Sequence, residues 1–98
     1  MVTQIKWRKK ALRQIAETAS YLETQFSIPT ANNFVDSVIK TIEKVSKNPK
    51  SYRKAPKTKS VYFVAIDKNR QMFYRIEGKI LIISAFFDSR QDPNKRPY

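Results

Sequence analysis

The N-terminal half of the chain carries two runs of apolar residues that recur every three or four positions, the spacing of one face of a helix. The first run comprises Leu12, Ile15, Ala19, Leu22 and Phe26. The second comprises Ala31, Val35, Val38, Ile42 and Val45, and Phe34 and Ile39 widen it. Because few residues separate the two runs, the pattern predicts an antiparallel helical hairpin.

Local signals mark where these helices start and stop. Ser27 suits an N-cap, and Pro29 suits the first turn, where a missing N–H costs little. Pro49 disfavours helical geometry in the residue before it, so the second helix should end near Asn48. Ahead of the first helix, residues 2–7 alternate weakly between polar and apolar and predict a short strand.

The C-terminal half changes to the alternating pattern of strands. Residues 60–66, 70–76 and 79–87 predict three strands, and residues 67–69 predict a turn between the first two. A two-residue loop of Glu77 and Gly78 should join the last two strands, because the only glycine of the chain supplies a positive φ there.

This loop predicts a register for the last two strands. Tyr74 should lie opposite Leu81, and Arg70 opposite Ala85. The last strand is apolar on both faces and should be central. The predicted fold is therefore a single α+β domain, residues 1–98, of order β-α-α-β-β-β. Its helical hairpin packs on a small, mostly antiparallel sheet.

Amino-acid composition narrows the range of functions that the chain could have. The chain holds 20 Lys and Arg against 8 Asp and Glu, a net charge of +12, which favours anionic partners. It has no histidine and no cysteine, so the usual general base, thiol nucleophile and soft metal ligands are missing, and we expect no cofactor and no metal. The start lacks the apolar segment of a secretory signal, and the longest apolar run has strand length. We therefore expect a cytoplasmic protein without a membrane partner.

The first candidate site is the basic connector, residues 47–59, which holds two prolines and no acidic residue. Such point charges suit phosphate binding, and Tyr52 among them could stack on a base. The candidate residues for binding a target or nucleic acid are Lys50, Arg53, Lys54, Lys57 and Lys59. A solvated basic loop is the alternative interpretation.

Three arginines form the second candidate site. Converging guanidinium groups can hold a phosphate and stabilise charge that develops on it. Arg70 and Arg90 are the candidate catalytic residues, and Arg75 joins the candidate binding residues. In the predicted register Arg70 and Arg90 meet only if the tail folds back. The alternative is ordinary ion pairing of these arginines with Asp88 or Asp92.

Several stretches, in this order along the chain, resemble the RelE/ParE superfamily of bacterial type II toxins, the small basic partners of toxin–antitoxin modules. Trp7, Ala11 and Ile15 open the first helix, and Ser27, Ala31 and Phe34 open the second, which ends at Asn48-Pro49. The hairpin from Arg70 to Ile83 follows, and the ending Arg90-Gln91-Asp92-Pro93 is similar to that of ParE-like, plasmid-stabilisation members.

The resemblance implies a toxin that arrests growth and is neutralised by a cognate antitoxin, which we expect to be acidic and encoded adjacently. ParE-like members inhibit DNA gyrase, whereas RelE-like members cut mRNA on the ribosome with a set of Lys, Arg and Tyr side chains. Arg70 and Arg90 fall where two arginines of that set would lie.

Three departures from the RelE-like pattern bear on this choice. The strand at residues 60–66 carries no lysine, and a tail tyrosine is present only as Tyr98, whereas Arg96 lies nearer the expected place. Asp88 also stands where several nucleolytic members have a histidine. They favour a ParE-like inhibitor that acts by binding. The alternatives are a ribosome-dependent mRNA endoribonuclease and a non-toxic, basic nucleic-acid-binding module, so enzymatic activity stays open.

Overall fold

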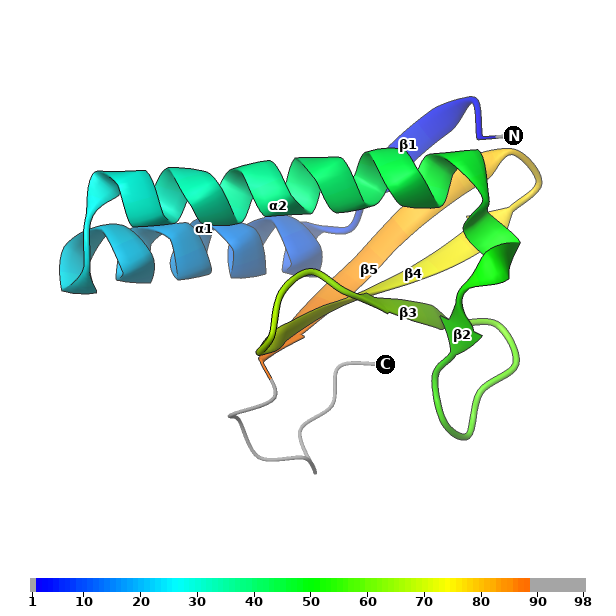
Figure 1. Ribbon diagram of the computed structural model, residues 1–98. Coiled ribbons are helices and arrows are strands. Elements are labelled where there is room, and N and C mark those ends of the chain that lie inside the picture. Colours follow the sequence, from blue (N-terminus) through cyan, green and yellow to red (C-terminus); the bar gives the residue numbers. More distant parts are fainter. Residues whose placement is uncertain (1, 89–98) are drawn as a thin grey trace.

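The computed structural model describes residues 2–88 and shows two layers, a helical hairpin and a five-stranded sheet (Figure 1). The elements in chain order are β1 (Gln4–Trp7), α1 (Lys9–Gln25), α2 (Ile28–Lys47), a 3₁₀ turn (Pro49–Ser51), β2 (Arg53–Lys54), β3 (Tyr62–Ala65), β4 (Arg70–Glu77) and β5 (Ile80–Asp88). The strand order is β1-β5-β4-β3-β2, with only the β1–β5 pair parallel. The predicted α+β class is confirmed, although the short β2 within the basic connector was missed.

The helix boundaries follow from the local signals in the sequence. The Ser27 side chain accepts a hydrogen bond from the N–H of Thr30, and a proline occupies the first turn of α2. The helix ends at Lys47, one residue before Asn48-Pro49. Figure 1 shows α1 and α2 running antiparallel. Within residues 2–88, neither helix combines the length and apolarity needed to cross a bilayer.

The main core lies between the hairpin and one face of the sheet. Its buried members are Ala11, Leu22, Ala31, Phe34, Val38, Ile42, Val45, Met72, Tyr74, Leu81, Ile83 and Phe86. The prediction of the first apolar stripe is wrong at two positions, because Leu12 is 52% exposed and Phe26 is 66% exposed. Ala11 takes the inward position next to Leu12, and Phe26 lies at the closed end of the hairpin, which extends past the sheet (Figure 1).

The central position of β5 is confirmed, but the predicted register of the β4–β5 hairpin is wrong. The loop consists of Gly78 and Lys79, with Gly78 at φ +61°, so the strands start pairing at Glu77 and Ile80. Farther along, a bulge leaves Ser84 of β5 without a partner on β4. Together these two shifts place Arg70 opposite Asp88 instead of Ala85.

The Tyr74 side chain ties the sheet to the end of α2. Its hydroxyl donates a hydrogen bond to the carbonyl oxygen of Pro49 at 2.6 Å, and its ring stacks on Tyr62 with centroids 5.3 Å apart. Burial raises the pKa of the Tyr74 phenol well above its ordinary value, and the neighbouring Tyr52 and Tyr62 raise it further. The neutral phenol is therefore the form that the folded protein favours.

We predict that Tyr74→Phe lowers the free energy of unfolding at neutral pH by about 1 kcal/mol, because the Pro49 carbonyl loses its donor. The raised pKa makes the tyrosine stabilising below the unfolded-state pKa of about 10, and this contribution is lost as pH rises above it. The variant should therefore lose stability less steeply than the wild type above about pH 10. Urea unfolding across this range, with the exposed Tyr21→Phe as control, measures both effects. Parallel curves for wild type and Tyr74→Phe would contradict the assignment.

Candidate functional site

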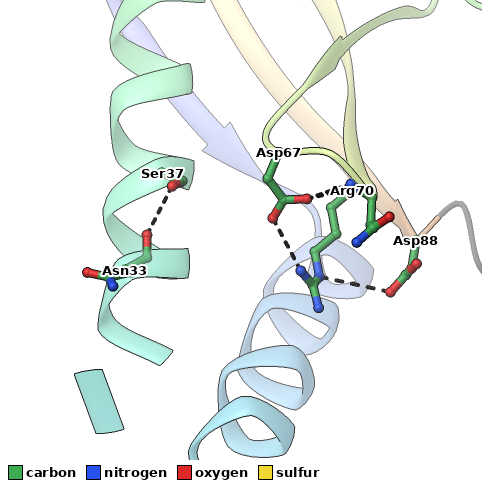
Figure 2. Close-up of polar contacts among 6 residues, drawn as sticks. Asn33, Ser37, Asp67, Arg70 and Asp88 are labelled. Carbon is green, nitrogen blue, oxygen red and sulfur yellow. Dashed lines mark hydrogen bonds and ion pairs between the residues drawn. The ribbon is translucent and has the colours of Figure 1, made fainter. Parts of the chain in front are cut away.

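Arg70 lies at the start of β4, and its guanidinium group sits between two carboxylates (Figure 2). Its Nη1 donates to Oδ2 of Asp67 at 3.2 Å, and its Nε lies 4.0 Å from Oδ2 of Asp88. The Arg70 side chain is only 14% exposed. Since Asp67 comes from the β3–β4 loop and Asp88 from the end of β5, the arginine joins two segments at one end of the sheet.

Asp67 is held in place by the backbone of its own loop. Its Oδ1 accepts hydrogen bonds from the N–H groups of Asn69 at 2.8 Å and Arg70 at 2.9 Å. This is the local side-chain-to-backbone bonding that aspartate brings to turns. Because one carboxylate oxygen fixes the turn and the other binds the guanidinium, the turn and the ion pair stabilise each other.

The helices complete the surroundings of Arg70. The guanidinium carbon lies over the ring of Phe34 from α2, 5.3 Å from its centroid, a cation–π contact. Nearby on α2, Ser37 donates a hydrogen bond to the Asn33 carbonyl (Figure 2). A cavity of about 150 Å³ adjoins the cluster. Its lining comprises Gln14, Glu17, Thr18, Phe34, Arg70, Phe86, Phe87 and Asp88.

Gln14 connects α1 to β5 beside this cavity. Its Oε1 accepts the backbone N–H of Phe86 at 2.8 Å. The β1 strand ends at Trp7, whose register partner on β5 is Ile83, so β5 continues past the end of its neighbour. The Gln14 side chain therefore satisfies a backbone donor that lies beyond the β1–β5 ladder.

The charges around Arg70 limit its chemistry. Two carboxylates in contact with one guanidinium compensate its charge, so its attraction for a phosphate is weaker than that of an unpaired arginine. The sequence offers no histidine or cysteine to act as a base or nucleophile. Among residues 2–88, no group of three potential metal-ligating side chains lies together. The contacts of Arg70 are thus those of an ion-pair network that holds two segments of the fold together, more than those of a phosphate-binding site.

The candidate binding residues of the basic connector point in different directions. Lys54 on β2 lies over the Tyr62 ring, with its Nζ 5.7 Å from the centroid, on the helix side of the sheet. Arg53 pairs with Phe63, whose ring packs in a second, smaller core cluster on the opposite side. Lys50 lies in the 3₁₀ turn. Lys57 and Lys59 are exposed in the β2–β3 loop.

The structure also separates the arginines. Arg70 and Arg75 are five residues apart on β4, so their side chains leave opposite faces of the sheet. Arg75 is exposed on the face away from the helices, the same side as Phe73. Arg90 lies outside the described residues, as does Asp92. Within residues 2–88, therefore, Arg70 is not brought together with the other candidate arginine or with the basic connector.

Sequence reasoning missed three residues of this cluster. Asp67 was predicted only as a turn residue, although an aspartate that begins a turn before a strand is a signal for the bonding seen here. Phe34 was predicted only as a core residue. Gln14 lies 72 positions from Phe86, and no sequence pattern links the two. Asp88 was considered as an ion-pair partner, and for Arg70 the structure shows that pair.

We predict that Arg70→Ala destabilises the protein by about 2 kcal/mol, because two partly buried carboxylates lose their cation. Arg75→Ala, an exposed position on the same strand, should change stability by less than about 0.5 kcal/mol. Chemical denaturation of both variants at neutral pH tests this. An Arg70→Ala protein as stable as Arg75→Ala would show that the ion pairs of Arg70 do not stabilise the fold.

A strained residue in the basic connector gives another prediction. Lys57 has φ +64°, and the Thr58 N–H bonds weakly to the Ala55 carbonyl at 3.3 Å, so the turn has Pro56 and Lys57 at its centre. A turn with positive φ at its third residue favours glycine. Lys57→Gly should therefore raise the free energy of unfolding by about 0.5–1 kcal/mol, whereas Lys59→Gly should not. Equal effects of the two substitutions in thermal melts would contradict this.

Comparisons with known proteins agree on the type of fold. Among solved structures, the chain is similar to one described as the chromosomal ParDE TA system from P. aeruginosa, with a TM-score of 0.76 and 12% identity over 89% of this chain and 96% of that one. It is also similar to the YoeB dimer from Staphylococcus aureus, with a TM-score of 0.62 and 12% identity over 87% and 94% of the two chains. No curated protein matches the chain significantly. Residues 5–93 match the family described as the ParE toxin of the type II toxin–antitoxin system parDE. The chain therefore belongs to the ParE toxin family of type II toxin–antitoxin systems.

Proposed function

We propose that this toxin arrests growth by binding a cellular protein, with DNA gyrase as the target, and that it does not cut mRNA. The observation that carries the proposal is the engagement of Arg70 by Asp67 and Asp88. Cleavage of a phosphodiester needs preorganised positive charge at the scissile phosphate, and here Arg70, whose side chain is 14% exposed, already has two anionic partners.

Further features support binding over cleavage. The strand Tyr62–Ala65 contributes no lysine, and the chain has no histidine to transfer protons. Where nucleolytic relatives place a histidine, Asp88 contacts Arg70 instead. A binding inhibitor needs neither a base nor a free guanidinium at this place. It needs a stable, charged surface, which a net charge of +12 supplies.

A ribosome-dependent endoribonuclease is the second candidate, and the basic connector is the observation in its favour. Its lysines and Arg53 suit ribosomal RNA, and the Lys54–Tyr62 contact shows a cation and an aromatic ring side by side. In that activity Arg70 and Arg90 would hold the phosphate. Binding of phosphate would then require the Arg70 guanidinium to leave at least one of its carboxylates.

The cognate antitoxin is the partner expected in either case. The similar P. aeruginosa structure is described as a ParDE system, which supports such a pair. We propose that the antitoxin is acidic, because the field of this chain attracts negatively charged proteins, and that its gene is adjacent.

Two assays with the purified protein distinguish the candidates. We expect inhibition of gyrase-catalysed supercoiling by the toxin. We also expect no new mRNA ends when it is added to a reconstituted translation reaction and the mRNA is mapped by primer extension. The double variant Asp67→Asn/Asp88→Asn removes both negative charges beside Arg70. Its activity in the two assays, compared with that of the wild type, shows whether these ion pairs limit cleavage. Ribosome-dependent cuts made by the wild-type protein, with supercoiling unaffected, would replace this proposal with the endoribonuclease.

A further inference from the structure

The closed end of the helical hairpin exposes three large apolar side chains that lie close together in the sequence. Tyr21 is 54% exposed, Phe26 is 66% exposed and Ile28 is 59% exposed. We call these three residues the apolar tip. Figure 1 shows this end of the hairpin extending past the sheet. Because large apolar side chains are unfavourable in water, their gathering at a protruding end is typical of a contact surface.

Hydrogen bonds fix the backbone of the apolar tip. The Leu22 carbonyl accepts the N–H groups of both Phe26 and Ser27, at 3.0 and 3.1 Å. Ser27 then caps α2, and its hydroxyl lies 2.9 Å from that of Thr30. The Tyr21 and Phe26 rings meet edge to face, with centroids 6.4 Å apart. The aromatic pair is therefore ordered before any partner binds, which lowers the entropy cost of binding.

The hairpin end also differs from the rest of the chain in charge. Residues 14–39 contain no Lys or Arg, so all 20 cations lie elsewhere in the sequence. The same stretch holds Glu17, Glu23 and Asp36, all three of them exposed. Glu17 lies beside Arg13 at the base of the stretch, with 3.9 Å between Oε1 and Nε. A chain of net charge +12 thus has one end that is negatively charged.

This charge and the protruding shape determine what the apolar tip can bind. Nucleic acids and anionic membranes require cations, which residues 14–39 lack. A second copy of the chain is disfavoured because two molecules of net charge +12 repel each other. A protruding apolar end buries most of its surface when it enters a hollow on another protein. Its carboxylates then favour cations at the rim of that hollow.

We propose that the apolar tip is the surface by which the toxin contacts its cellular target, a protein with an apolar pocket bordered by basic groups. Phe26 and Ile28 enter this pocket as anchors, and Glu23 meets the basic rim. The inference rests on the proposed function, because it takes the protein target of growth arrest as the partner. An enzyme that acts on DNA has basic surfaces of this kind, since Lys and Arg neutralise phosphates.

The basic remainder of the chain has a different role in this binding. Attraction over long distances depends on net charge, speeds association and weakens as salt rises. The lifetime of a complex depends more on a few buried anchors at the contact. The positive field of the chain therefore draws in an enzyme that carries bound DNA, and the apolar tip determines how long the two stay together.

Two measurements with the full-length protein test this role of the apolar tip. The first gives the association and dissociation rates with purified, DNA-bound gyrase, from surface plasmon resonance at about 0.15 M and about 0.4 M salt. The second is growth arrest after induced expression, with protein levels matched by immunoblot. The growth measurement requires no assumption about which protein is the target.

Two substitutions in the apolar tip should shorten the lifetime of the complex. Phe26→Ser should speed dissociation at least about tenfold and relieve growth arrest. Ile28→Glu should act in the same direction, and a carboxylate is tolerated at the start of α2. The matched controls are Leu12→Ser and Ile39→Ser, at exposed apolar positions of the same two helices outside the tip. Both controls should dissociate and arrest growth as the wild type does.

A pair of charge reversals tests the negative end. Glu23→Lys and Glu77→Lys raise the net charge equally, and both glutamates are exposed. Only Glu23 lies within the hairpin end, whereas Glu77 ends β4. Glu23→Lys should therefore weaken binding several-fold and Glu77→Lys should not. Circular dichroism verifies that each variant is folded, and if Phe26→Ser does not fold, Ile28→Glu and Glu23→Lys still decide the question.

The outcomes separate this inference from the gyrase proposal. If the wild type arrests growth without binding gyrase, the gyrase proposal is wrong, and the growth arrest of Phe26→Ser against Leu12→Ser still tests the apolar tip. Full growth arrest by Phe26→Ser and Ile28→Glu would overturn the inference, as would an equal loss in Leu12→Ser. A dissociation rate that changes with salt but not with Phe26 would also overturn it. A wild type that neither binds gyrase nor arrests growth would contradict both proposals.

Discussion

The structure depends on β5 being buried on both faces and paired on both edges. On one edge it forms a parallel ladder with β1, and on the other an antiparallel ladder with β4. Its side chains alternate between the main core under the helices and the smaller cluster on the other face. Burial of this apolar strand draws the N-terminal strand, the hairpin and the C-terminal strands together, and it removes apolar side chains on both faces of the strand from water.

The bulge at Ser84 decides which side chains of β5 meet the helices. Without it, alternation from Ile83 would turn Ala85 and Phe87 toward the hairpin. With it, Phe86 faces the main core and Phe87 the smaller cluster. The same reversal directs Asp88 to the side of Arg70. The Ser84 hydroxyl is buried without a hydrogen-bond partner among the described residues, so the bulge has an energetic cost that the improved packing offsets.

These features explain what the sequence could predict. Ser27, Pro29 and Pro49 act on their own neighbours, so the helix boundaries were predictable from local chemistry. The single glycine located the hairpin loop but not which two residues form it. A loop moved by one residue shifts the pairing by two and keeps each side chain on its predicted face, so Tyr74 and Leu81 share one core cluster although they do not lie opposite each other. The one-residue bulge changes the face, and it depends on packing against α1 and α2 that no local pattern encodes.

The same reasoning applies to the candidate site. An arginine at the start of a strand is recognisable, but its role depends on what lies opposite, and the two register shifts determine that. Asp88 and Asp67 are two of only eight acidic residues in the chain, yet both contact Arg70. Among the described candidate cations, the least exposed is therefore one whose charge is compensated, whereas the exposed lysines and arginines lie on both faces of the sheet. Catalysis on a phosphate needs charges that converge on one point. A dispersed positive surface attracts and orients an anionic protein without such convergence, and this distribution suits an inhibitor that acts by binding.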